Sequence, residues 1–220
     1  MTRGPRLLPE PAGREFTEML TPPDWAQVFG RPAPLELELG SGAGGFALAY
    51  AAQHPGVNYV AIEWRKKYAR EVEHRARQRC LANLRVVEAD ARAVVPRLFA
   101  PGSLSAIHLQ FPDPWWKRAH QKRQLLSGAF ARLLFDLAAP GALFDLRTDV
   151  EDRARAMLRT LEAAGFTNPS GPGRFHPPEP AEPASSRERR YLASGEPVFR
   201  ARLRKPSLVF APPPGGPFSS

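Results

Sequence analysis

The sequence predicts an α/β fold in which a mostly parallel, twisted sheet carries helices on both faces. Between residues 35 and 168, short apolar runs alternate with longer stretches of helical periodicity in the order β-α-β-α-β-α-β-α-β-α. This alternation is typical of a parallel sheet with crossover helices. The chain has 220 residues, of which 43% are hydrophobic, which is enough apolar surface for one core. No repeat of fixed period is present.

The individual elements follow from apolar periodicity. Strands are expected at 35–39, 57–62, 84–89, 104–111 and 142–148. Helices are expected at 46–53, 65–80, 125–138 and 151–164. In the helix at 65–80, Tyr68, Val72 and Ala76 recur at i, i+4 and i+8 and are expected to face the core. Gly165 ends the last of these helices, because glycine readily adopts the backbone conformation that terminates a helix.

The two ends of the chain differ from this periodic part. Two β-prone stretches within 189–204 flank Ser194-Gly195, which predicts a C-terminal antiparallel hairpin that completes the sheet. Residues 1–34 contain seven prolines and are expected to form an extended N-terminal arm. Residues 206–220 are expected to be a disordered tail. The globular domain is therefore predicted at 35–205.

The chain is strongly basic. It has 31 Lys or Arg against 22 Asp or Glu, a formal net charge of +9, and 26 of its cations are arginine. Such a charge favours a polyanionic partner, either nucleic acid or an anionic membrane surface. The single Cys80 excludes a disulfide framework and multi-cysteine metal motifs. No apolar run reaches the roughly 18 residues of a membrane span, and no export signal is recognised, so we expect a cytoplasmic protein without a membrane or metal partner.

A candidate ligand site follows from the residues at the strand ends, because ligands bind open parallel sheets outside the carboxyl ends of the strands. Acidic residues end the first three strands and glycines follow the first: Glu38, Gly40, Gly42, Gly44, Glu63 and Asp90. The glycine spacing alone also satisfies the dinucleotide fingerprint, through Gly40, Gly42 and Gly45. Three carboxylates suit a cationic cofactor better than a pyrophosphate, which favours S-adenosylmethionine. Glu63 is then expected to accept hydrogen bonds from the ribose, and Asp90 to face the adenine amino group.

The segment after the fourth strand, FPDPWWKRAHQKR at 111–123, combines an acid between two prolines, two tryptophans and a run of cations. The prolines restrict the backbone around Asp113, so its carboxylate is expected to be held at the mouth of the cofactor pocket. Lys117, His120, Lys122 and Arg123 suit the phosphates of a nucleic acid. A proline-stiffened loop with a solvated basic face is the alternative, but it leaves Asp113 unexplained.

Taken together, these residues resemble the bacterial tRNA (guanine-N(7)-)-methyltransferase family, whose members are class I S-adenosylmethionine-dependent methyltransferases with a Rossmann-like fold. The resemblance covers about 35–204. Its motifs occur in order, as E-x-G-x-G-x-G at 38–44, I-E at 62–63, D-A at 90–91, F-P-D-P-W at 111–115 and T-D-x-E at 148–151. The stretch 185–188, with the sequence SSRE, stands where the family has T-x-Y-E.

The resemblance implies a role for each matching position. The residues implied for S-adenosylmethionine are Glu38, Gly40, Gly42, Gly44, Glu63, Asp90, Ala91 and Asp113, and Asp113 is also the implied catalytic residue. The residues implied for the guanosine are Lys117, Asp149, Ser185, Arg187 and Glu188. The chain departs from the family at Ala119 and Gln124, where arginine is usual, at Arg187, where tyrosine is usual, and at Ser185, where threonine is usual.

The predicted function is methyl transfer from S-adenosylmethionine to N7 of a guanine in the tRNA variable loop, by a monomer or a homodimer. N7 carries a lone pair and no proton, so its attack needs no general base. A nearby carboxylate stabilises the positive charge that develops on the base, and Asp113 either does this or orients the guanine. Three alternatives stay open: a divergent paralogue that methylates another RNA or a small molecule, a non-catalytic RNA-binding protein, and a nicotinamide-dependent dehydrogenase.

Overall fold

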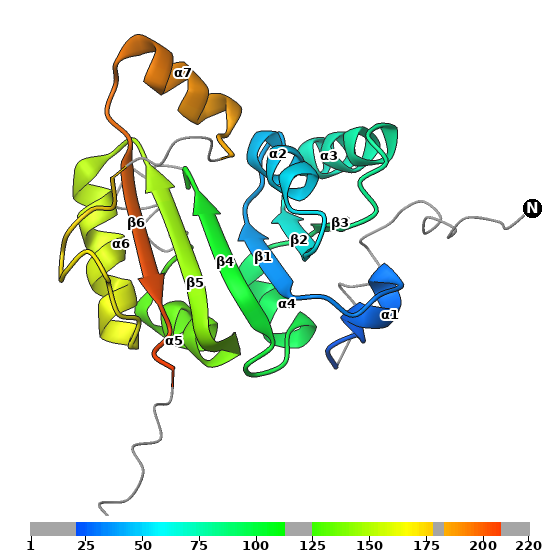
Figure 1. Ribbon diagram of the computed structural model, residues 1–220, viewed down its shortest axis with the longest axis horizontal. Helices are drawn as coiled ribbons and strands as arrows, with labels where there is room; N and C mark the ends of the chain where they lie inside the picture. Colours follow the sequence, from blue (N-terminus) through cyan, green and yellow to red (C-terminus); the bar gives the residue numbers. More distant parts are fainter. Residues whose placement is uncertain (1–20, 113–124, 178–182, 208–220) are drawn as a thin grey trace, which may run out of the picture.

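The computed structural model describes residues 21–112, 125–177 and 183–207. The strands in this part of the chain are β1 (Leu35–Leu39), β2 (Asn58–Glu63), β3 (Leu84–Glu88), β4 (Leu104–Gln110), β5 (Ala138–Thr148) and β6 (Phe199–Arg204). The helices are α1 (Trp25–Phe29), α2 (Gly45–Gln53), α3 (Lys66–Gln78), α4 (Ala91–Leu98), α5 (Gly128–Leu137), α6 (Glu151–Ala164) and α7 (Ser186–Ser194). Figure 1 shows the strands side by side in one twisted sheet.

The strand order of this sheet is β3-β2-β1-β4-β5-β6. Strands β1 to β5 pair in parallel, and β6 pairs antiparallel with β5. The chain builds outward from β1 to β3 and then returns to place β4 on the other side of β1, so the order reverses between β1 and β4. In sheets of this type, such a reversal opens a crevice at the carboxyl ends of the strands. The predicted fold class is therefore confirmed.

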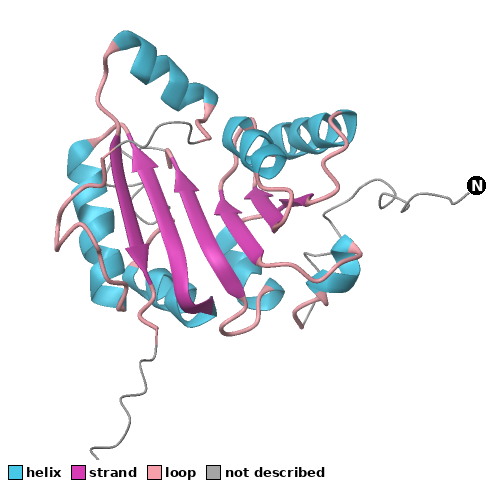
Figure 2. Ribbon diagram, viewed as in Figure 1, coloured by secondary structure: helices cyan, strands magenta, loops and turns pink. Residues whose placement is uncertain are grey.

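The two faces of the sheet are covered by different helices, as Figure 2 shows. On one face, the larger apolar cluster joins the sheet to α1, α4, α5 and α6, with side chains such as Leu37, Ile107 and Leu158 fully buried. On the other face, a smaller cluster joins Tyr59 and Val86 to α2 and α3. None of the described helices has both the length and the apolar character to cross a bilayer.

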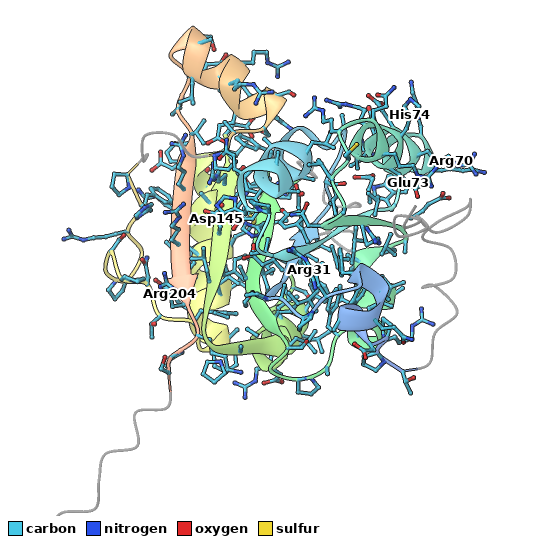
Figure 3. The ribbon with its side chains drawn as sticks, turned by 45° about the vertical axis from the view of Figure 1, so that its right-hand side comes forward. Arg31, Arg70, Glu73, His74, Asp145 and Arg204 are labelled. Carbon is cyan, nitrogen blue, oxygen red and sulfur yellow. The ribbon has the colours of Figure 1, made fainter. Side chains whose placement is uncertain are left out.

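Helix α3 is amphipathic: one stripe of its residues is buried against the sheet and the others face solvent. Its buried residues are Ala69, Val72 and Ala76, so the inward stripe is confirmed at two of the three predicted positions, and Tyr68 is half-buried beside the stripe. Arg70 and His74 point away from the sheet (Figure 3). Helix α4 lies between β3 and β4, and its bounds were not predicted.

The predicted hairpin within 189–204 is wrong. Its first half belongs to helix α7, and the antiparallel partner of β6 is β5 rather than a neighbouring segment. The helix forms because the Ser185 hydroxyl accepts a hydrogen bond from the Glu188 amide at 3.0 Å, which caps its N-terminus. Gly195, at a φ of 71°, ends it in the left-handed conformation.

Candidate functional site

A pocket of about 890 Å³ lies at the carboxyl ends of the parallel strands, a volume in the range of small-molecule sites. Its lining comes from the loop after β1, from the ends of β2, β3 and β4, and from residues of α6 and α7. The predicted cofactor residues that line it are Glu38, Gly40, Gly42, Glu63, Asp90 and Ala91. The fold thus brings together residues that lie up to 53 positions apart in the chain.

Gly44, the remaining glycine of the predicted motif, does not line the pocket. Its φ is 73°, and a Cβ built there would lie 2.4 Å from Cγ2 of Val72 on α3. Because no side chain fits so close an approach, this glycine lets α3 pack against the loop. Its role in the structure is packing.

The glycine loop is held by several polar contacts. The Gly40 and Ser41 amides donate to the Ile62 carbonyl at 2.8 and 3.1 Å. The Gly42 amide donates to Oε2 of Glu63 at 2.8 Å. Arg75 of α3 donates to the Ala43 carbonyl at 2.9 Å. These bonds fix the loop backbone next to the pocket before any ligand binds.

Glu38 is a deeply buried acid on the pocket, with 1% of its surface exposed. Its Oε2 accepts a hydrogen bond from the Tyr59 hydroxyl at 3.2 Å. Burial disfavours the charged form and raises the pKa of this carboxyl to about 7, although the charge of His108 opposes the rise. A cation placed beside Glu38 would favour its ionised form.

Glu63 is equally buried, and it acts as a connector between two loops. While its Oε2 accepts from the Gly42 amide, its Oε1 accepts from the Arg65 amide at 2.9 Å and from the Arg65 Nε at 3.0 Å. A carboxylate offers about four lone-pair sites, so acceptor capacity is left for a ligand hydroxyl. The predicted ribose contact is compatible with this arrangement.

Asp90 occupies a more solvated position at the start of α4. Its Oδ1 accepts from the Arg92 amide at 3.0 Å, which caps the helix, and its Oδ2 accepts from Nη2 of Arg92 at 2.7 Å. Hydrogen bonding from Arg92 lowers the pKa of Asp90. The next residue, Ala91, is buried against the pocket and leaves space beside the carboxylate.

The described residues that are predicted to bind the substrate fall into two groups, because Asp149 and Glu188 do not line the pocket. Ser185 and Arg187 line the pocket. Oδ2 of Asp149 accepts from Nη2 of Arg187 at 3.1 Å and from the hydroxyl of Tyr191 at 2.7 Å. Partial burial raises the pKa of Asp149, but the hydrogen bond from Tyr191 and the Arg187 charge lower it more, so this pKa lies below its usual value.

Glu188 lies beneath α7, with 1% of its surface exposed. Its carboxylate contacts Nη1 of Arg147 at 3.1 Å and Nη2 of Arg200 at 2.7 Å. Arg147 is itself buried and also pairs with Asp145 at 3.1 Å. This group of charges connects α7 to β5 and β6 and does not line the pocket.

Several predicted site residues lie outside the described part of the chain. They are Asp113, Lys117, His120, Lys122 and Arg123, together with the family departures Ala119 and Gln124. Of the motif that contains Asp113, Phe111 and Pro112 are described, and both line the pocket. Strand β4 therefore leads directly from the pocket into this segment.

The structure adds residues that the sequence analysis did not name. Trp64, 62% exposed and next to Glu63, lines the pocket, as do Gln110 of β4 and Arg190 of α7. Tyr191 contacts Asp149 from the helical position four residues after Arg187. That spacing marks a shared helix face, but it becomes visible only when the segment is read as a helix.

No metal centre is found in the described ranges. Within 21–112, 125–177 and 183–207, no group of three or more His, Cys, Asp or Glu side chains is arranged to hold a metal ion. The lone Cys80 is exposed.

Comparison with known proteins identifies close relatives. A family model described as a putative methyltransferase matches residues 32–201. A tRNA (guanine-N(7)-)-methyltransferase of Myxococcus xanthus is 64% identical over 203 residues, covering 92% of this chain and 98% of the relative. One of the same name from Anaeromyxobacter dehalogenans is 53% identical, covering 83% and 92%.

Several solved structures that resemble this one are named as methyltransferases. The 16S rRNA methyltransferase KamB superposes with a TM-score of 0.61 at 20% identity, covering 83% of this chain and 93% of KamB. A mutant 16S rRNA (adenine(1408)-N(1))-methyltransferase from Catenulisporales acidiphilia, described with cosubstrate SAM, gives 0.54 at 18% identity, covering 84% and 92%. At such identities the likeness concerns the fold.

Proposed function

The chain belongs to the tRNA (guanine-N(7)-)-methyltransferase family, and we propose that it transfers a methyl group from S-adenosylmethionine to N7 of a guanine in the variable loop of tRNA. The observation that carries the proposal is the set of three acids, Glu38, Glu63 and Asp90, around one pocket at the ends of three adjacent strands. The strongly basic composition suits an RNA substrate. A tRNA substrate also favours a cytoplasmic location.

The pocket residues fit S-adenosylmethionine in charge. Glu38 is a buried carboxylate whose pKa is raised by burial, and an ammonium group beside it would offset the cost of that burial. We assign Glu38 and the backbone of Gly40 and Gly42 to the methionine moiety. Glu63 takes the ribose hydroxyls, and Asp90 with Ala91 takes the adenine.

The reaction depends mainly on how the guanine and the cofactor are positioned relative to each other. When bound, S-adenosylmethionine supplies a methyl group activated by its sulfonium sulfur. The N7 lone pair forms the new bond as the carbon–sulfur bond breaks, and the electrons of that bond stay on sulfur. The base becomes positively charged, so a fixed carboxylate lowers the energy of the transition state. We assign this role to Asp113, and we propose that it also contacts the cofactor.

The substrate contacts are proposed from charge and position. Lys117, His120, Lys122 and Arg123 would contact tRNA phosphates. Asp149, Ser185 and Arg187 would meet the guanosine on the α7 side of the pocket. The buried ion pairs of Glu188 favour an indirect contribution, in which this residue positions α7. Whether the enzyme acts as a monomer or a homodimer stays a prediction.

The test is methyl transfer to defined tRNA. The purified protein is incubated with labelled S-adenosylmethionine and unmodified tRNA, and the RNA is then cleaved at 7-methylguanine. We expect label in tRNA and a single cut in the variable loop. Label in a different RNA only would support a divergent paralogue, and tRNA binding without transfer would support a non-catalytic RNA-binding protein.

Asp113 is tested in the same assay. Asp113→Ala should lower turnover by about a hundredfold or more, the usual cost of losing a group that stabilises transition-state charge, while calorimetry still detects S-adenosylmethionine binding. Asp136→Ala, which removes an exposed carboxylate on α5, serves as the control and should keep full turnover. Near-normal turnover of the Asp113 variant would remove the proposed catalytic role.

A further inference from the structure

We propose that the guanidinium group of Arg187 is the surface on which the base of the target nucleotide stacks, with Asp149 and Tyr191 as residues that position it. The proposal rests on the tRNA substrate proposed above and names the residue that holds the base. Unpaired RNA bases stack on aromatic rings or on the planes of arginine guanidinium groups. Arginine is planar and suited to such stacking, whereas lysine is not.

The position of Arg187 in the pocket is the first support. Arg187 lines the same pocket as the acids assigned to the cofactor, together with Phe111, Pro112 and Ser186. Its side chain is 33% exposed, so part of it remains open to a ligand. A base that stacks there would lie in the same pocket as the cofactor.

The orientation of the guanidinium group is the second support. Nη2 donates to Asp149 at 3.1 Å, and Nε donates to the Tyr191 hydroxyl at 3.4 Å. Its Cζ lies 5.7 Å from the ring centroids of both Phe111 and Tyr191. Those two rings are stacked, with centroids 6.1 Å apart. Arg187 is therefore held by hydrogen bonds at its edge and supported by two aromatic rings.

The backbone next to this group also has an unusual conformation. Phe111 has a φ of 49°, a left-handed conformation that is costly for an aromatic residue and is often found at functional sites. Its amide donates to the Arg147 carbonyl at 2.8 Å, which anchors it to β5. This conformation occurs where β4 leaves the sheet, and it places the Phe111 ring against α7.

Helix α7 approaches the cofactor loop closely. A Cβ built on Gly45 would lie 2.8 Å from the Ser186 backbone nitrogen, so a glycine is needed for the two segments to meet. Since Arg187 follows Ser186 directly, its side chain begins beside the loop that borders the cofactor. This contact holds α7, and Arg187 with it, against the loop that borders the proposed cofactor site.

The charge of Arg187 is compatible with a product base that is positive. An unpaired guanidinium next to the base would oppose methylation, because like charges repel. Here the Asp149 carboxylate forms an ion pair with Arg187 at 3.1 Å, so the pair is neutral as a unit. Asp149 thus both orients Arg187 and compensates its charge.

The experiment compares three variants at position 187 for affinity to tRNA in the presence of saturating S-adenosylmethionine. Arg187→Lys keeps the charge and loses the plane, Arg187→Tyr keeps a plane and loses the charge, and Arg187→Ala loses both. We expect affinity and kcat/KM to fall about tenfold to a hundredfold in the Lys and Ala variants, as for a lost stacking contact. The Tyr variant should stay within about threefold of the wild type.

A tRNA that lacks the base at the target position separates stacking from other roles. On this abasic tRNA, the affinity difference between the wild type and Arg187→Ala should disappear. If the difference persists, or if Arg187→Lys binds like the wild type, Arg187 contacts phosphate or only pairs with Asp149, and the proposal is overturned. Binding is measured independently of turnover, so failure of methyl transfer tests the proposed function separately.

Matched controls use an arginine away from the pocket. Arg159→Lys and Arg159→Ala alter an exposed residue of α6 and should change neither affinity nor turnover. Tyr191→Phe tests the positioning role, since it removes the hydroxyl bonded to Asp149 and Arg187 and keeps the ring. It should lower kcat more than it raises KM for tRNA, and an unchanged kcat would show that this hydroxyl does not orient Arg187.

Discussion

Glu38 shows at the scale of a single residue how burial prepares a carboxylate for a cationic ligand. Since its pKa is raised to about 7 by burial, it is largely protonated at pH 6 and largely ionised at pH 8. The ionised form attracts the ammonium group of S-adenosylmethionine. We therefore predict that affinity rises about tenfold from pH 6 to pH 8, in proportion to the ionised fraction.

The variant Glu38→Gln separates this effect from the titration of the ligand itself. At pH 8 the variant should bind S-adenosylmethionine more weakly than the wild type, and at pH 6 the two affinities should converge. Calorimetry at both pH values provides the measurement. A difference of equal size at pH 6 and pH 8 would show that the charge of Glu38 does not control binding.

Residues of the site were predictable where local sequence determines their place. Glu38, Glu63 and Asp90 each end a strand, and parallel strands bring their carboxyl ends to one edge. The partners of Glu188 were not predictable, because Arg147 lies 41 residues away and no local pattern pairs the two. Tyr191 was missed because its segment was assigned to a strand.

At the scale of elements, apolar periodicity predicted the five parallel strands and four of the helices, but it missed α1, which lies within the expected extended arm and packs into the core, and it failed at α7. The stretch from 189 onward contains β-prone residues, and the hairpin prediction followed from them. The capping signature S-x-x-E at 185–188 is a helix-start signal, and the Ser185 cap and Gly195 stop set the bounds of α7. Local hydrogen bonding outweighed strand propensity there.

Helix α7 is attached to the sheet through the buried ion pairs of Glu188. We therefore predict that substitution of this one residue lowers the free energy of unfolding. Glu188→Gln removes the counter-charge of buried Arg200 and one of the two acids that pair with Arg147, and breaking a buried pair costs on the order of 3 kcal/mol. Urea unfolding should show this loss in the free energy of unfolding, and KM for tRNA should rise as α7 loosens.

The exposed pair of Glu151 and Arg155 on α6 provides the matched comparison. It has a similar distance, 2.7 Å, but both side chains are about half exposed. Glu151→Gln should therefore cost less than about 1 kcal/mol. Equal losses for the two variants would mean that burial does not set the strength of the Glu188 contacts.

At the scale of the whole molecule, the two faces of the sheet differ in chemistry. The face toward α4, α5 and α6 holds the larger apolar cluster, whereas the face toward α2 and α7 buries Glu36, His108, Asp145 and Arg147. Figure 3 shows Asp145 on β5, next to the edge strand β6. Buried charges of this kind are tolerated only when they are paired, so the fold depends on their protonation states.

His108 makes this dependence measurable. Its Nε2 lies 3.0 Å from Oε2 of Glu36, and its Nδ1 lies 3.9 Å from Oδ2 of Asp145. Burial lowers the pKa of the imidazole, but the two carboxylates outweigh burial and raise it to about 9. The folded protein therefore binds this proton more tightly than the unfolded chain does, whose histidine has a pKa of roughly 6.5.

The sign of the resulting pH dependence follows because the pKa of His108 is higher in the folded protein than in the unfolded chain. The stabilisation is fully present below pH 6.5 and is lost as the pH rises through about 9, and the gap corresponds to about 3 kcal/mol at most. Urea unfolding of the wild type should show a falling free energy of unfolding between pH 7 and pH 9.5. In His108→Gln this fall should be smaller, because the other titrating groups are shared by both proteins. An identical fall in the two proteins would mean that His108 is neutral in the fold, and that Glu36 and Asp145 are balanced by the arginines of β5 and β6 instead.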